Sequence, residues 1–194
     1  GTERVTRDIV LKPLDFEHAI NMVKYAQKKG IFVAANFIIG FPTETWEEIR
    51  QTINFAEGIK VDYAKIFIAI PLRNTEMYDL AQNTNSLIND RLDSETMWTV
   101  GGLIKSKHWS ADDLTILRAY EWDRINFSDQ KKLQKISNRM GIKVEELNVI
   151  RKRTLDNAIK TISERKSQDY TVKKAADIAL VHSENSFKEK QNKL

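Results

Sequence analysis

Residue 36 places a polar side chain inside an apolar run, where a bound ligand would meet the backbone. Asn36 is an amide within the run 31–40, and Gly40 at its end allows a ligand to approach the main chain. Thr45 begins a helix whose free backbone amides can receive an anion or a ribose hydroxyl. A structural role fits the same residues, with Asn36 hydrogen-bonded inside a barrel and Gly40 selected for its turn geometry. The pattern therefore predicts either a ligand site or an ordinary turn.

A second candidate site follows the apolar run 61–70. Pro71 ends this run, and residues 72–76 lead into a short helix that Thr75 caps. The guanidinium of Arg73 can bind a carboxylate there, although a solvated loop arginine fits the position equally well. The two turns belong together because ligands bind at the carboxyl ends of parallel strands.

Metal and thiol chemistry find little support in the sequence. The chain has no cysteine, which excludes a disulfide scaffold, a thiolate zinc site, a cysteine nucleophile and an iron–sulfur cluster held by local thiolates. His18, His108 and His182 share no ligand spacing, so we expect no metal site of their own. The acidic pairs 47–48 and 112–113 fall in first helical turns, where the helix dipole explains them better than acid–base catalysis.

Alternating helices and strands must position the candidate residues. Apolar residues three and four apart predict a helix over 15–29, and Thr45 and Glu48 form a capping box for a second helix. The runs 31–40 and 61–70 are almost continuously apolar, which is typical of parallel strands covered on both faces. This order predicts right-handed βαβ crossovers and a parallel α/β sheet. Two strands are too few for a complete sheet, so we expect their partners upstream or on another chain.

The chain beyond residue 83 is expected to be mostly helical. Positions that suit helix starts are Ser94, Ser110, Asp129, Val144 and Thr171. We divide the chain into an α/β part over 1–83, a helical extension over 84–184 and a polar, disordered tail over 185–194. The opening residues 1–5 suit neither a signal peptide nor a helix, and we expect an internal fragment of a longer protein.

Composition indicates a folded protein. Hydrophobic residues make up 41% of the 194 residues, enough for one core, and no apolar run approaches the roughly 20 residues needed to span a bilayer. We therefore expect a soluble, cytoplasmic chain without a membrane partner. The net charge is +4, and the basic excess lies in the second half of the chain.

That basic second half offers a different function. Residues 133–147 have the helix, glycine turn and helix order of a helix-turn-helix, and the basic residues 151–153 follow. Glu145 and Glu146, at the start of the second helix, suit the helix dipole but repel phosphate. Nucleic acid is therefore not the expected partner. A non-catalytic helical interaction module or nucleic-acid-binding module is the alternative to an enzyme.

The motif residues resemble a known enzyme family. The stretch 37–45, followed by a helix, a strand and 71–78, resembles the carboxyl-terminal half of the barrel in radical S-adenosylmethionine (SAM) proteins, in particular the branch that often carries a cobalamin-binding domain. Residues 1–5 resemble the segment after the fourth barrel strand, so the resemblance covers 1–83. It implies the C-terminal part of a partial (β/α) barrel with parallel strands, followed by a mostly α-helical extension.

The resemblance implies roles for individual residues. Ile38 would contact adenine, Gly40 would let the nucleoside approach, and Asn36, which stands where the family has glycine, would bond the ribose. Pro71 would lie near the adenine. Lys12 would pair with the SAM carboxylate, with an ordinary surface lysine as the alternative.

The resemblance also implies a cofactor that this chain cannot hold alone. In the family, three cysteines spaced Cys-x-x-x-Cys-x-x-Cys hold a [4Fe–4S] cluster, which cleaves SAM reductively to start radical chemistry. Because this chain has no cysteine, we expect the ligands in a missing N-terminal barrel half. The parent protein would be an iron–sulfur-dependent oxidoreductase or transferase acting on an unknown substrate, with cobalamin as an optional cofactor. This fragment alone would be inactive.

Overall fold

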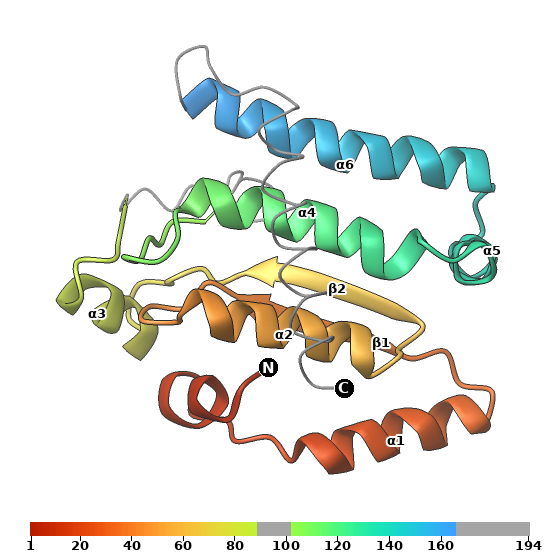
Figure 1. The fold of residues 1–194 in the computed structure, drawn as a ribbon, viewed down its shortest axis with the longest axis horizontal. Helices are drawn as coiled ribbons and strands as arrows, with labels where there is room; N and C mark the ends of the chain where they lie inside the picture. Colours follow the sequence, from red (N-terminus) through yellow and green to blue (C-terminus); the bar gives the residue numbers. More distant parts are fainter. Residues whose placement is uncertain (89–101, 166–194) are drawn as a thin grey trace, which may run out of the picture.

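The computed structural model describes residues 1–88 and 102–165 (Figure 1). Its elements in chain order are η1 (Val5–Ile9), α1 (Phe16–Lys28), β1 (Ala34–Ile39), α2 (Trp46–Gly58), β2 (Tyr63–Ile68), α3 (Glu76–Asn83), α4 (Ala111–Phe127), α5 (Gln130–Met140) and α6 (Val144–Arg165). The helix starts expected at Ser94 and Thr171, and the tail 185–194, lie outside the described residues.

Local sequence signals set the helix starts where they were expected. Thr45 and Glu48 form the predicted capping box of α2, in which each side chain bonds the backbone N–H of the other residue. Ser110 and Asp113 form an equivalent box at α4, and the Thr75 side chain caps α3. Each cap satisfies backbone donors that the first turn of a helix leaves free.

The opening residues correct the prediction that they form no helix. Residues 5–9 form η1, a π-helical turn whose end is closed by a hydrogen bond of 2.9 Å from the Val10 N–H to the Val5 carbonyl. Val5 is buried in the core, and Arg4 forms an ion pair with Glu48 of α2. Tertiary contacts therefore impose a helical turn on a segment that has no helix signal of its own.

The two strands pair in parallel, which confirms the predicted α/β class. Asn36 lies opposite Lys65, and Ile38 lies opposite Phe67. Both strands are shorter than the apolar runs that predicted them. Within the described residues the sheet has two strands and does not close into a barrel.

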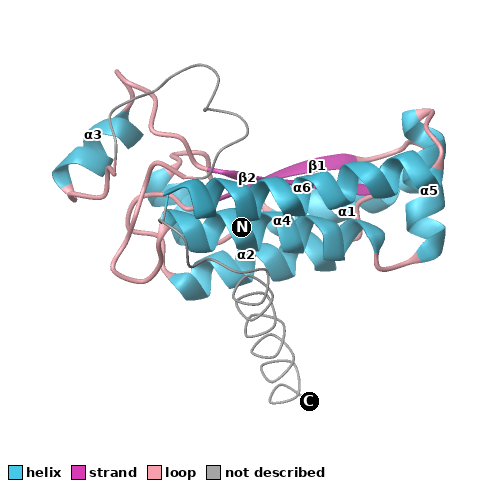
Figure 2. Ribbon diagram, turned by 90° about the horizontal axis from the view of Figure 1, so that it is seen from above, coloured by secondary structure: helices cyan, strands magenta, loops and turns pink. Residues whose placement is uncertain are grey.

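Helices cover one face of this sheet. Phe37 and Ile39 of β1 and Ile66 of β2 share a core with Ile53 of α2 and Leu117 of α4. Seen from above, the strands lie along one side of the helical layer (Figure 2). The helix α6 packs against α4 through a second apolar cluster, and α5 contacts both α4 and α6 at one end of the molecule. The core thus combines the α/β part with the first helix of the extension.

The opposite face of the sheet corrects the prediction that the strands are covered on both sides. Asn36, Ile38, Lys65 and Phe67 alternate with the buried residues and are exposed, Ile38 by 44% and Phe67 by 39%. Apolar side chains are costly to leave in water, so this face is suited to a further layer or a ligand.

The helical extension follows the expected order. Gly141 ends α5 in the left-handed conformation, with φ of +69°, and α6 begins at Val144. Among the described helices, none combines the length and the apolar character required to cross a membrane.

Candidate functional site

The open sheet face brings two of the predicted site residues together. Asn36 and Ile38 extend from β1 on this face, and β2 adds Lys65 beside Asn36 and Phe67 beside Ile38. An amide, an ammonium group and two apolar side chains therefore share one surface. Such a surface suits a ligand with a flat apolar part and polar or anionic substituents.

Sequence reasoning missed Lys65 and Phe67, although the same signal was available. Lys65 interrupts the apolar run 61–70 in the way that Asn36 interrupts the run 31–40. Parallel pairing in this register then places the two polar residues side by side. The register itself depends on the packed helices and could not be predicted from either strand alone.

Gly40 has a structural reason that requires no ligand. Its φ of +85° lies in the left-handed region, which favours glycine. A Cβ atom at this position would come within 2.4 Å of the Leu114 Cδ1 atom of α4. The space that a Cβ atom of residue 40 would need is therefore already occupied by Leu114 of α4.

Three further predicted residues lie outside the two strands. Pro71 is buried just after β2, and Arg73 is exposed in the loop that follows it. Lys12 is exposed in the segment between η1 and α1, where its backbone N–H donates to the Thr6 carbonyl at 2.8 Å.

Glu44 holds the turn that follows β1. Glu44 is fully buried, and its Oε2 atom accepts hydrogen bonds from the backbone N–H groups of Gly40 at 2.6 Å and Phe41 at 3.0 Å. The Trp109 indole donates to the Glu44 carbonyl at 2.8 Å. Burial raises the pKa of Glu44 to about 7, although the two N–H donors act in the opposite direction. The sequence gives no sign of this burial, because Glu44 stands in a polar turn.

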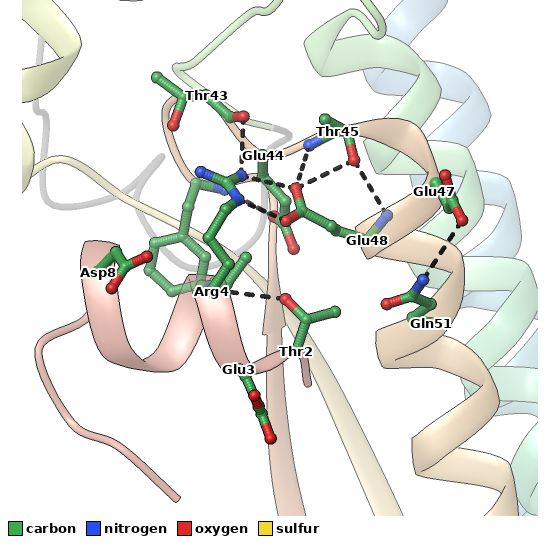
Figure 3. Close-up of polar contacts among 12 residues, drawn as sticks. Thr2, Glu3, Arg4, Asp8, Thr43, Glu44, Thr45, Glu47, Glu48 and Gln51 are labelled. Atoms are coloured by element: carbon green, nitrogen blue, oxygen red, sulfur yellow. Dashed lines mark hydrogen bonds and ion pairs between the residues drawn. The ribbon is translucent and has the colours of Figure 1, made fainter.

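Arg4 ties the start of the chain to the same turn (Figure 3). Its Nε and Nη2 atoms donate to the two Glu48 carboxylate oxygens, each at 2.6 Å, and Nη2 also donates to the Thr43 carbonyl at 3.1 Å. The Arg4 guanidinium lowers the pKa of Glu48 to about 2, and hydrogen bonds from Thr45 act in the same direction. The turn after β1 is thus fixed both from α2 and from η1.

The outer edge of β2 is occupied by a side chain of α4. Asn126, fully buried, accepts a hydrogen bond from the Ala64 N–H at 2.9 Å and donates to the Ala64 carbonyl at 2.8 Å. The amide therefore imitates the backbone of a neighbouring strand. The backbone N–H and C=O groups of Ala34, Asn36 and Ile38 point toward the outer edge of β1, because successive residues of a strand direct these groups to opposite sides. By contrast with β2, no hydrogen-bond partner is seen on this edge in the described residues.

Neither a metal nor the basic helices define a second site. The described residues contain no group of three or more histidine, aspartate or glutamate side chains that could hold a metal ion. Arg151 is engaged structurally, since its guanidinium pairs with the Asp123 carboxylate at 2.7 Å and lies over the Phe127 ring.

Comparison with known proteins finds enzymes that transfer methyl or methylthio groups. An uncharacterized methyltransferase of Pyrococcus horikoshii is 34% identical over 110 residues, or 57% of this chain and 24% of that protein. A cytidylyl-2-hydroxyethylphosphonate methyltransferase of Streptomyces wedmorensis is 32% identical over 83 residues, or 40% of this chain and 16% of that protein. A tRNA-2-methylthio-N(6)-dimethylallyladenosine synthase of Shewanella baltica is 29% identical over 92 residues, or 43% of this chain and 19% of that protein.

The chain spans a quarter or less of the length of these relatives. No protein-family model matches it, and no solved structure matches it.

Proposed function

We propose that this chain is the carboxyl-terminal part of a radical SAM enzyme that transfers methyl or methylthio groups, and that its open sheet face is the inner wall of a partial barrel. The observation that carries this proposal is the asymmetry of the sheet. One face is packed under α2 and α4, and the other exposes Ile38 and Phe67. In a (β/α) barrel, helices cover the outer face and ligands lie toward the carboxyl ends of the strands.

The two sheet edges support the same proposal. Asn126 occupies the outer edge of β2 at Ala64, so β2 suits the last strand of an open barrel. Within the part of the chain that the structure describes, nothing pairs with the outer edge of β1, which leaves this edge available for a further parallel strand. The proposed partner is the remaining part of the barrel, which would add its strands beside β1.

The residues present fit SAM but not the cluster. The chain has no cysteine, and its described residues form no metal-binding group, so we derive no step through an iron–sulfur cluster here. Ile38 would contact the adenine ring, and Asn36 would bond the ribose. Lys12 would pair with the SAM carboxylate. When bound, SAM would supply the group to be transferred or the radical chemistry typical of this superfamily.

Each side chain has a defined task in this proposal. The apolar surface of Ile38 and Phe67 excludes water from one side of the ligand. The Asn36 amide can both donate to and accept from a ribose hydroxyl. Glu44 and the Arg4–Glu48 pair hold the turn that ends β1 and so orient the strand end.

The test uses the longest polypeptide encoded in frame with this chain. It is purified without oxygen, supplied with iron and sulfide, reduced with dithionite and assayed for 5′-deoxyadenosine released from SAM. We expect a Cys-x-x-x-Cys-x-x-Cys motif upstream of residue 1 and release of the product. Absence of the motif from the encoded polypeptide, together with no turnover of SAM, would contradict the proposal.

A further inference from the structure

The Glu44 carboxyl group has an unusual hydrogen-bond balance. Its Oε2 atom accepts two backbone N–H groups, while its Oε1 atom is buried and has no hydrogen-bond partner among the described residues. Buried polar atoms are almost always paired, so an unpaired oxygen requires a physical explanation. Contact with bulk water is not that explanation, because Glu44 is fully buried.

We infer that Glu44 is a positioning residue whose gain and loss of a proton changes how firmly the turn 40–45 is held at the end of β1. The importance of that turn for a ligand rests on the proposed function. The proton exchange itself does not, since it depends only on the burial and bonding of Glu44.

Each protonation state satisfies only part of the site. The ionised carboxylate makes strong, charge-assisted bonds to the Gly40 and Phe41 N–H groups, but it leaves a negative charge on a buried oxygen without a donor. The neutral acid removes the cost of the buried charge, but it accepts the two N–H groups more weakly. The two states are therefore close in free energy, and the pKa of about 7 agrees with this balance.

The charged groups around Glu44 act in both directions and leave its ionised and neutral states close in free energy. In the 194-residue chain the Gly1 amino group favours the Glu44 anion, and the electrostatic influence of Glu44 extends to Arg4. From α2, the negative charge of Glu48 disfavours the anion. The segment before α4 presents the Trp109 indole, which is neutral and donates to the Glu44 carbonyl rather than to its carboxyl group.

The consequence is a turn that loosens as the pH rises through neutrality. Burial raises the pKa of Glu44 to about 7, so ionisation favours an opened turn in which the carboxylate reaches water, even though the carboxylate is the stronger acceptor for the Gly40 and Phe41 N–H groups. Below that pKa, the neutral acid is buried without the cost of a charge, and the turn stays closed. The site at the end of β1 should therefore bind its ligand better in the acidic part of this range.

The test is a pH titration of the 194-residue chain followed by nitrogen–proton correlation NMR between about pH 5 and pH 9. We expect the Gly40 and Phe41 amide protons to shift together with one midpoint near neutrality. In Glu44→Gln the two shifts should be lost. The matched control is Glu47→Gln, which changes an exposed glutamate in the first turn of α2 and should leave both shifts unchanged.

The wild-type chain alone can overturn the inference. Gly40 and Phe41 amides that stay constant across the pH range contradict it, even where Glu44→Gln fails to fold. Shifts that persist in a folded Glu44→Gln variant contradict it as well. Glu44→Asp, which remains ionisable but shorter, should keep a titration with a displaced midpoint.

A second arm measures the effect on ligand binding. In the longer polypeptide, SAM affinity should decrease between about pH 6 and pH 8 in the wild type and stay constant in Glu44→Gln. A wild-type affinity that does not change with pH overturns the link to the ligand. Complete absence of SAM binding would instead contradict the proposed function, while the NMR titration still decides the role of Glu44.

Discussion

Two glutamates four positions apart are held in opposite electrostatic states. Glu44 is buried with its pKa raised to about 7, whereas Glu48 faces Arg4 and has its pKa lowered to about 2. Both carboxyl groups bond backbone N–H groups of the same turn, Glu44 at its start and Glu48 at Thr45. The difference arises because the hydrogen-bonded arginine favours the charged form of Glu48, whereas burial disfavours the charged form of Glu44 more than its neighbours favour it.

For Glu44 we predict stability that declines as the pH rises. Its folded pKa exceeds the unfolded value, so the folded chain binds more protons between pH 4.5 and about 7. The stabilisation is complete below the unfolded pKa and is lost as the pH rises through the folded pKa, by roughly 3 kcal/mol for a shift of this size. Urea unfolding at several pH values should show this decline in the wild type and a smaller one in Glu44→Gln. Equal declines in both proteins would contradict the prediction.

For Arg4 we predict that replacement by lysine, which keeps the positive charge, still lowers the stability of the fold. Arg4→Lys keeps a cation but loses the forked contact with Glu48, and should lower the free energy of unfolding by about 1 kcal/mol near neutral pH. The pKa of Glu48 is depressed, so its contribution is present above its unfolded pKa and disappears as the pH falls toward 2.

The exposed pair Arg7–Asp8 provides the control for Arg4. Its side chains are 63% and 47% exposed, and Arg7→Lys should change the unfolding free energy little. Urea denaturation of both variants gives the comparison. Equal effects of the two substitutions would show that the forked contact of Arg4 adds no stability.

At the scale of elements, local signals were predictable and tertiary contacts were not. The capping boxes at Thr45 and Ser110 depend on residues three positions apart, so the sequence contains the whole signal. The Asn126–Ala64 contact joins residues 62 positions apart, and Arg4–Glu48 joins residues 44 positions apart. Such pairs depend on how α4 and η1 pack against the sheet, which no local pattern determines.

Asn126 allows a direct test of the β2 edge. Asn126→Leu removes the acceptor and donor that Ala64 uses, and leaving both backbone groups buried without partners should cost about 2–3 kcal/mol. Asn157→Leu changes an exposed asparagine of α6 and should have little effect. Chemical denaturation measures both. A loss below about 0.5 kcal/mol in Asn126→Leu would mean that the edge does not depend on this amide.

At the scale of the whole molecule, the sheet has a covered face and an open face. The sequence predicted the α/β class from its alternating helices and apolar runs. It singled out Asn36 as a polar residue in an apolar run, and Ile38 through the family resemblance, and the structure places both on the open face. It did not predict which face would stay open, because continuously apolar strands suggest cover on both sides. The proposal that further strands complete the site starts from the open face and from the outer edge of β1, which has no partner among residues 1–88 and 102–165.

The most direct test of this account is SAM binding by the longer polypeptide with a charge placed on the open face. Ile38→Asp should weaken SAM binding at least about tenfold, because it puts a carboxylate where the adenine ring is proposed to lie. Ile31→Asp is the matched control, since Ile31 is 58% exposed and precedes β1. Both variants should bind the same amount of iron as the wild type. Equal dissociation constants for SAM in the wild type, Ile38→Asp and Ile31→Asp would contradict the central claim that this face is the inner wall of the site.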